Sequence, residues 1–394
     1  MISNRQIFLQ SLAQTSDSPL ALEIEYANGI DMFTTDHKRI MDLISGISVS
    51  NLGHSHPEIV ASVQQQAARH MHLMVYGELV QAPQTRLASL LTSLLPASLQ
   101  SIYLVNSGSE AVEGALKIAK KFTGRSQIIA FDNAYHGSTH GALSVMGNET
   151  YRNAFQTLLP DVLHLAFNEP NELQQITEKT ACVIIEPVQA EAGVRIPAKG
   201  YLQALRKRCT ETGTLLIFDE IQTGMGRTGT MFNFEQQDAT PDILLLAKAL
   251  GSGMPLGAFI ASREIMETIT FNPPLGHITT FGGHPVCCAA ASTGIEILLR
   301  DQIIQTVESK GALFQSLLSE ATAVKEIRRS GLLMAIELES PEKVQQVIKT
   351  CLDKGMLLDW FLFDAKSIRI APPLIISEEQ IREAGEILVN VLSA

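Results

Sequence analysis

The segment "LLLAKALGSGMPLGA" (244–258) is the most informative in the sequence, because it places one lysine, Lys248, among residues that are apolar or small. An ammonium group that leaves water without a partner is strongly destabilising, unless the group loses its proton. A solvated helix face would not have these neighbours. Lys248 therefore either has a buried partner or is a neutral amine.

Short apolar segments alternate with helical patterns on both sides of Lys248. Apolar residues recur at helical spacing in 109–122, and a second helix is expected at 200–212. Continuous apolar strands separated by helices favour a mostly parallel sheet covered on both faces, with an active site at the carboxyl ends of the strands. The predicted buried strands are 101–105, 127–131, 181–186, 214–220, 243–247 and 257–261.

The pattern changes near residue 285. A long helix is expected at 284–300 and leads into shorter α and β patterns. We therefore predict an N-terminal segment (1–50) that packs with a small domain, a large domain (51–285) and a small C-terminal domain (286–394).

Composition narrows the class of protein. The chain has 394 residues, 45% of them hydrophobic, and no run of about 18 apolar residues that could span a membrane. The net charge is −11 and the basic residues are scattered, which argues against nucleic-acid binding. The N-terminus lacks the apolar region of a secretory signal. Five cysteines in apolar surroundings favour a reduced, cytoplasmic protein: Cys182, Cys209, Cys287, Cys288 and Cys351.

Asp219 follows the apolar strand of "TLLIFDEIQTG" (214–224), so it is expected to be buried and paired. It could cap a helix, form a structural ion pair, or hold a protonated ring nitrogen of a ligand. Lys248 follows the next strand, 29 residues later. The two residues could form a salt bridge, or a cofactor could lie between them.

A strand–turn–helix in "YLVNSGSEAVEGALKIAKK" (103–121) offers a possible anion site. The free N–H groups of Gly108, Ser109 and Glu110 and the helix dipole suit a phosphate. The alternative is an ordinary serine cap with a glutamate in the first turn.

Two further patterns are weaker. The segment "GMGRTG" (224–229) matches G-x-G-x-x-G and supports an alternative, a nicotinamide-dependent oxidoreductase. No amphipathic helix follows it, so we interpret it as a glycine-rich loop. The histidines at 54–56 and 70–72 lack metal-ligand spacing, and no metal is predicted.

The sequence resembles class III aminotransferases, which depend on pyridoxal 5'-phosphate. The motifs that carry the resemblance, in order, are "LISGISVSNLGHSHPEIV", "VNSGSEAVEGALKIAK", "AYHGSTHGALSV", "IIEPVQAEAGV", "FDEIQTGMGRTG", "LAKALGSGMPLGA", "TTFGGHPVCCAAA" and "IRIAPPLII". The resemblance implies an aspartate-aminotransferase-like fold of type I. This fold has a large domain with a mostly parallel seven-stranded sheet and a smaller α+β domain.

The resemblance also implies roles around the cofactor. Lys248 would bond to the cofactor aldehyde and then move a proton between the substrate and the cofactor. Asp219 would keep the pyridine nitrogen protonated. The other implied cofactor-binding residues are Ser107, Gly108 and Ser109 at the phosphate, Tyr135 stacked on the ring, His136 and Glu186 nearby, Gln222 at the phenolic oxygen, and Thr280 from the partner subunit.

Two residues are implied to recognise substrate. Arg369 matches the arginine that grips an α-carboxylate, and Glu191 matches the glutamate that pairs with it in ornithine- and acetylornithine-type members. Glu191 could neutralise Arg369 when an ω-amine enters and swing away for a 2-oxo acid, or the two could be a permanent ion pair. Ser138 replaces an arginine that many such relatives use for a distal carboxylate, and His140 lies near it in sequence.

We therefore expect a transaminase that moves a terminal amino group, from an ornithine- or acetylornithine-like or other ω-amino donor, to a 2-oxo acid such as 2-oxoglutarate. The alternatives are a 4-aminobutyrate-type or other ω-amino-acid transaminase, an aminomutase on the same scaffold and, more remotely, the oxidoreductase. The expected partners are the small-molecule donor and acceptor, and a second copy in a homodimer with shared active sites.

Overall fold

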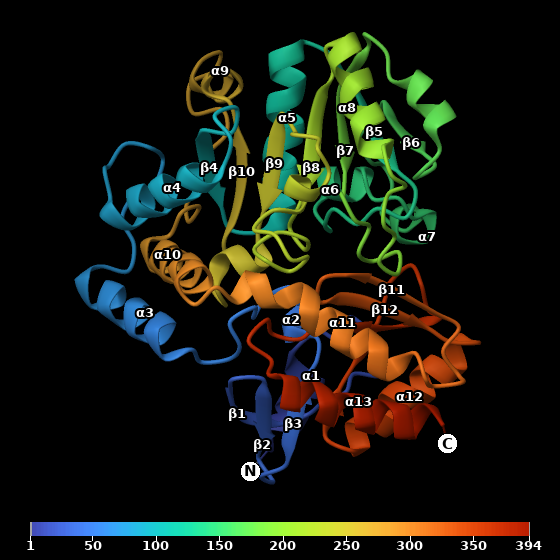
Figure 1. Ribbon diagram of the computed structural model, residues 1–394. Coiled ribbons are helices and arrows are strands. Elements are labelled where there is room, and N and C mark those ends of the chain that lie inside the picture. The colour runs from blue at the N-terminus through green and yellow to red at the C-terminus, as the bar shows by residue number, and fades with distance from the viewer. Residues whose placement is uncertain (1, 394) are drawn as a thin grey trace.

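The computed structural model describes residues 2–393 and has a sheet with covering helices above a second layer built from both ends of the chain (Figure 1). No helix of residues 2–393 is long and apolar enough to cross a membrane. The helices whose packing is not described in this subsection are α1 (Asn4–Ser11), α2 (Ser45–Ser48), α6 (His140–Ser144), α7 (Glu149–Asn153) and α9 (Arg263–Glu267).

The central sheet has seven strands. All run parallel except β10, which is antiparallel to both of its neighbours. The predicted mostly parallel seven-stranded sheet is thus confirmed. The strands in spatial order are β4 (Ser101–Val105), β10 (Gly257–Ala261), β9 (Ile243–Leu246), β8 (Leu215–Asp219), β7 (Thr180–Ile185), β5 (Gln127–Phe131) and β6 (Val162–Leu165).

Six of these strands agree with the predicted ones to within one or two residues. The seventh, β6, was not predicted, because its four residues "VLHL" include the polar His164 and are only partly buried. β6 lies at the edge of the sheet, where one neighbour suffices and the apolar signal is weaker.

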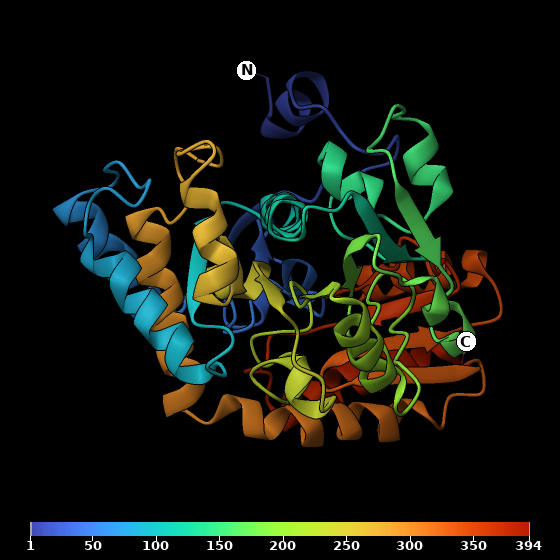
Figure 2. The same ribbon diagram turned by 90° about the horizontal axis from the view of Figure 1, so that it is seen from above.

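Helices cover both faces of the sheet, because side chains alternate between the faces along each strand. α5 (Gly108–Thr123) packs on the face that carries Ile128, Ile184 and Leu245. α8 (Tyr201–Thr212) packs on the face that carries Ile129, Val183 and Leu244. In the view from above, α5 is seen along its axis near the middle of the molecule (Figure 2).

The two ends of the chain meet in the lower layer (Figure 1). One sheet joins β1 (Ile24–Asn28), β2 (Asp31–Thr34) and β3 (Arg39–Asp42) to β13 (Met356–Leu357), and β3 runs parallel to β13. A second sheet has the order β11 (Glu326–Ser330), β12 (Leu333–Glu337), β15 (Ser367–Ile370) and β14 (Asp359–Trp360). The helices of this part are α11 (Val307–Leu318), α12 (Pro341–Asp353) and α13 (Glu378–Leu392).

α10 (Pro285–Arg300) is the long helix predicted at 284–300, and it packs against α3 (Pro57–Arg69) and α4 (Ala82–Leu94). It therefore contacts elements on the other side of the predicted boundary at residue 285. The domain boundaries at 50 and 285 stay predictions.

The glycine-rich segment 224–229 forms turns and is followed by a short 3-10 helix, η2 (Asn233–Gln236). It therefore lacks the strand–turn–helix context of a dinucleotide site. Its arginine, Arg227, is fully buried and donates to the side chains of Ser45 and Asn51 and to the carbonyl oxygens of Leu332 and Pro372. This one side chain ties the loop to both ends of the chain.

We expect Arg227→Met to lower the free energy of unfolding by at least about 3 kcal/mol, because several buried acceptors lose their donor. Arg86→Met is the matched control, since Arg86 forms an exposed ion pair with Glu296. That change should cost no more than about 1 kcal/mol. Urea unfolding measures both, and equal losses would contradict this role for Arg227.

Candidate active site

A cavity of about 480 Å³ lies where β7, β8 and β9 end, and the beginning of α5 forms one of its walls. Most predicted site residues line it: Ser107, Gly108, Ser109, Tyr135, His136, Glu186, Glu191, Asp219, Gln222 and Lys248. The structure thus brings together residues from five separate segments, as expected when carboxyl ends of parallel strands meet at one edge of a sheet.

Lys248 follows β9 directly and begins the 3-10 helix η3 (Lys248–Gly251). Its backbone is in the left-handed region (φ 46°), a conformation that costs a lysine about 1 kcal/mol or more. The side chain is half-buried, and its Nζ donates to Oε1 of Gln222 at 2.6 Å. Burial is the main reason that the pKa of Lys248 lies below the 10.5 of an ordinary lysine.

Asp219 ends β8 and is buried, and its partner is His136. Oδ2 lies 2.7 Å from Nδ1 of His136, and Oδ1 accepts from the N–H of Ile221 at 3.0 Å. Within residues 2–393, Asp219 forms no ion pair with Lys248. The alternative of a direct salt bridge between these residues is therefore wrong.

Two buried polar atoms of the cavity lining have no partner within residues 2–393: Nε2 of His136 and Nε2 of Gln222. Buried polar atoms are almost always hydrogen-bonded in native proteins, so unpaired ones need an explanation. Beside an open cavity, the simplest explanation is a polar ligand. The chemistry of the lining therefore fits a bound cofactor.

Glu186 follows β7 and holds two loops of the site together. Oε1 accepts from the N–H of Tyr135 at 2.9 Å, and Oε2 accepts from the N–H of Ala190 at 3.1 Å. Burial, together with the nearby Asp219 carboxylate, raises the pKa of Glu186 to about 8. The loop at 135–137 carries Tyr135 and His136 into the cavity.

The N-terminus of α5 forms the wall opposite the strand ends. Ser107 is the helix cap, and its Oγ accepts from the N–H of Glu110 at 3.2 Å, so the capping alternative is confirmed for Ser107. The cap does not use the N–H groups of Gly108 and Ser109, which lack intrahelical acceptors at a helix start. The segment can therefore be both a capped helix and an anion site.

Gly137 explains how the 135–137 loop approaches this helix so closely. Its φ is 123°, and a Cβ at this position would lie 2.1 Å from Oγ of Ser109. A larger residue would push the loop away from the beginning of α5 and displace Tyr135 and His136.

Glu191 and Arg369 form a buried ion pair. Nη2 of Arg369 lies 2.5 Å from Oε2 of Glu191 and also donates to the carbonyl oxygen of Trp360 at 3.1 Å. The guanidinium lies over the ring of Phe361, at 4.6 Å. Glu191 lines the cavity, whereas Arg369, on β15, stands behind it.

Besides Arg369, three predicted or discussed residues lie outside the cavity lining. Ser138 is exposed, with its Oγ 3.5 Å from the hydroxyl of Tyr135. His140 is exposed at the start of α6. Thr280 is also exposed, in the loop that precedes α10.

Sequence reasoning missed Asn106, which lines the cavity. Its side chain donates to Oε2 of Glu110 and to Oγ1 of Thr279, both at 2.9 Å. The available signal was its position, directly after β4 and before the helix cap. Among residues 2–393, no group of three or more histidine, cysteine or acidic side chains could hold a metal ion.

Residues 12–392 match the family model of class III aminotransferases. With the seven-stranded sheet and the cavity at its strand ends, this match defines a fold type I transaminase. The chain belongs to the class III aminotransferase family and is a pyridoxal-phosphate-dependent enzyme, so the resemblance noted in the sequence is confirmed.

Individual relatives agree with this assignment. An acetylornithine aminotransferase of Methanopyrus kandleri is 41% identical over 370 residues, which cover 93% of each chain. The solved ornithine aminotransferase of Toxoplasma gondii has a TM-score of 0.91 at 28% identity, covering 98% of this chain and 92% of its own. An (S)-enantioselective ω-transaminase of Thermomicrobium roseum has a TM-score of 0.89 at 29% identity, covering 98% and 97%.

The lowered pKa of Lys248 predicts unusual reactivity in the cofactor-free protein. Only the neutral amine is a nucleophile, so a lower pKa moves half-maximal acetylation by acetic anhydride to a lower pH. Mass spectrometry should find this shift relative to Lys207, whose side chain is exposed. Pyridoxal phosphate should protect Lys248 and not Lys207. The same pH dependence for both lysines would contradict the prediction.

Proposed function

We propose that this transaminase moves the terminal amino group of an ornithine- or acetylornithine-like ω-amino donor to a 2-oxo acid, with 2-oxoglutarate as the acceptor. The observation that supports the reaction is an amine of lowered pKa, Lys248, in the same cavity as the buried Asp219. The relatives named for acetylornithine and ornithine support this choice of donor.

In this proposal each residue of the cavity has a separate role in binding the cofactor. When bound, pyridoxal phosphate supplies an electron-withdrawing ring that stabilises negative charge on the substrate carbon. The start of α5, at Ser107, Gly108 and Ser109, holds the phosphate. Asp219, braced by His136, keeps a proton on the ring nitrogen.

The remaining side chains position the cofactor and move protons. The Lys248 amine holds the cofactor before substrate enters and then carries the proton to and from the substrate carbon. Gln222, which is bonded to this amine, would donate to the phenolic oxygen of the bound cofactor. Tyr135 would stack on the ring, and Glu186 holds the loop of Tyr135 in place.

Arg369 and Glu191 serve two substrates in turn. With Glu191 in place, Arg369 is neutralised and a donor that presents an amine can enter. When Glu191 rotates away, Arg369 is free to bind the α-carboxylate of the 2-oxo acid in a bidentate manner. Among the residues within 2–393 that line the cavity, Lys248 is the only lysine or arginine. The lining therefore offers no second cation to bind a distal carboxylate of the substrate.

The lack of a second cation in the cavity lining also fits a second candidate function, a transaminase for other ω-amino compounds such as 4-aminobutyrate or diamines. Ser138 supplies no charge where many ornithine-type relatives carry arginine. The structural similarity to an ω-transaminase favours the same candidate. An aminomutase would use the same cavity without any acceptor.

The test is a half-reaction screen with the cofactor-loaded enzyme. Ornithine, acetylornithine, 4-aminobutyrate, lysine and diamines are each added, and conversion to the aminated cofactor is followed by absorbance. Lys248→Ala should abolish the conversion, and Asp219→Asn should slow it at least about 100-fold, whereas Lys207→Ala should change nothing.

Adding 2-oxoglutarate should then regenerate the starting spectrum and release glutamate. Product formed without any 2-oxo acid would favour the aminomutase. No spectral change with any amine would overturn the proposed function.

We also propose that the enzyme is a cytoplasmic homodimer whose active sites are shared. All five cysteines are free and buried, as in reducing compartments. Apolar side chains are exposed on two segments that touch, since the rings of His72 and Phe281 lie 4.9 Å apart. These exposed side chains are Met71, Leu73, Met74, Leu79, Val80, Phe271, Leu275, Ile278 and Phe281.

Thr280 stands next to Phe281 in this apolar region, and the family resemblance assigns it to the phosphate site of the partner subunit. We expect the protein to sediment as a dimer. Thr280→Ala should weaken retention of the cofactor. Mixed dimers of Thr280→Ala and Lys248→Ala chains should contain one site that has both residues intact. Activity that does not rise on mixing would contradict shared sites.

A further inference from the structure

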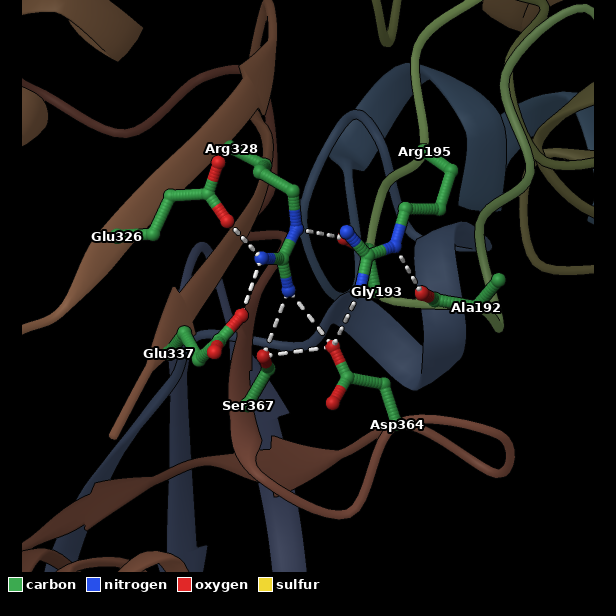
Figure 3. Close-up of polar contacts among 8 residues, drawn as sticks. All are labelled: Ala192, Gly193, Arg195, Glu326, Arg328, Glu337, Asp364 and Ser367. Carbon is green, nitrogen blue, oxygen red and sulfur yellow. Dashed lines mark hydrogen bonds and ion pairs between the residues drawn. The ribbon is translucent and has the colours of Figure 1, made fainter. Parts of the chain in front are cut away.

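Arg328, on β11, is buried and forms the centre of a polar cluster that has no role in the proposed cofactor chemistry (Figure 3). All five of its N–H groups have acceptors. Nε donates to the carbonyl oxygen of Gly193 at 2.6 Å, and Nη2 donates to Asp364 at 2.7 Å and to Ser367 at 2.9 Å. Nη1 donates to Glu326 and Glu337.

Two of these acceptors belong to the two loops that hold Glu191. Gly193 is in the turn 189–195, which Gln189 and Arg195 close through a pair of backbone hydrogen bonds of 3.0 and 2.9 Å. Asp364 is in the loop between β14 and β15. In the same loop, the N–H of Phe363 donates to the carbonyl oxygen of Glu191 at 3.0 Å.

The second loop also holds the Glu191 side chain. The N–H of Leu362 donates to Oε2 of Glu191 at 3.2 Å, the same oxygen that pairs with Arg369. Arg328 does not touch Glu191. It bonds to both loops at points one or two residues away from these contacts.

The loops meet closely at the cluster. Gly193 has a φ of 83°, and a Cβ there would lie 2.0 Å from Oδ2 of Asp364. Arg195 adds a bond from Nε to the carbonyl oxygen of Ala192 and lies 4.0 Å from Asp364 (Figure 3).

Behind the turn there is open space. A groove of about 890 Å³ is lined by Gln189, Ala192, Val194 and Arg195 of the turn and by Arg328 and Arg329 of β11. Ala190 and Val194 of the turn are nevertheless buried, in a small apolar cluster with Leu333, Ala335 and Phe361. Arg328 lines this groove and bonds the turn to β11 through the carbonyl oxygen of Gly193.

We propose that Arg328 is a positioning residue that holds Glu191 against Arg369, and so sets the balance between amine donors and 2-oxo acids. The inference rests on the proposed function for its consequence in catalysis. Because both loops are fixed at Arg328, Glu191 leaves Arg369 by rotation of its side chain, and the backbone bond from Phe363 stays. Without Arg328 the turn loses its side-chain bond to β11, and its apolar contacts alone hold Glu191 less firmly, so Glu191 leaves Arg369 more often.

The unpaired Arg369 cation then repels the cationic amine donor and still attracts the 2-oxo acid. We therefore expect Arg328→Gln to raise the KM of the amine donor about tenfold, as the loss of charged hydrogen bonds implies. The KM of the 2-oxo acid should stay equal or fall. Glu191→Ala should shift both constants in the same directions.

Arg329 provides the matched control on the same strand. It also lines the groove, but it pairs with Glu308 of α11 at 2.7 Å and, within residues 2–393, bonds neither of the two loops that hold Glu191. Arg329→Gln should leave the ratio of the two KM values unchanged. Asp364→Asn weakens the cluster without removing the arginine, and it replaces Arg328→Gln if that variant does not fold.

A second measurement needs no turnover. Amide hydrogen exchange in peptides covering 189–195 and 361–364 should be about tenfold faster in Arg328→Gln than in wild type, and unchanged in Arg329→Gln. Unchanged exchange in Arg328→Gln, or equal changes in both KM values, would overturn the inference. A wild type inactive with every amine would refute the proposed function and leave the exchange result to decide the role of Arg328.

Discussion

The site depends on keeping the Lys248 amine and the Asp219 carboxylate in one cavity without letting them bond to each other. Their strands, β8 and β9, are parallel neighbours, so both chains end at the same edge of the sheet. Separate partners, Gln222 for the amine and His136 for the carboxylate, then hold the two charges apart. A direct pair would give each group its counter-ion and leave neither able to act on a ligand.

The buried ion pair of Glu191 and Arg369 depends on a different balance of energies. Two charges removed from water gain little net stability from each other, but one of them left alone is strongly destabilised. Such a pair therefore adds little to the stability of the fold. It suits an exchange of partners, because any ligand anion that replaces Glu191 gives Arg369 a new counter-ion. The N–H of Phe363 fixes the backbone carbonyl of Glu191, whereas the N–H of Leu362 and Arg369 hold its side chain, so the side chain can rotate without moving the backbone.

Local sequence patterns sufficed for six strands of the sheet and for the beginning of α5. Apolar strands with polar residues at their ends located Asp219 and Lys248, whereas only the resemblance to the family pointed to the other cavity residues, Tyr135, His136, Glu186, Glu191 and Gln222. The edge strand β6 was not predicted, because a half-buried strand of four residues has little hydrophobic periodicity. The sequence also did not predict the pairing of His136 with Asp219, which are 83 positions apart, or the bond of Arg328 to Gly193, which are 135 positions apart. Only the folded chain shows that Ser138 is exposed and that Gln222 meets the amine.

The parallel pairing of β3 with β13 matters for how the chain is made. The paired residues are more than 300 positions apart, so the N-terminal strands emerge from the ribosome long before their partner. At about 5–20 residues per second, the wait is about 15 s or longer. Throughout that time β3 is an unpaired edge, open to association with other nascent chains. Truncated products that end before residue 356 keep this edge permanently, and they would be clients of chaperones or proteases.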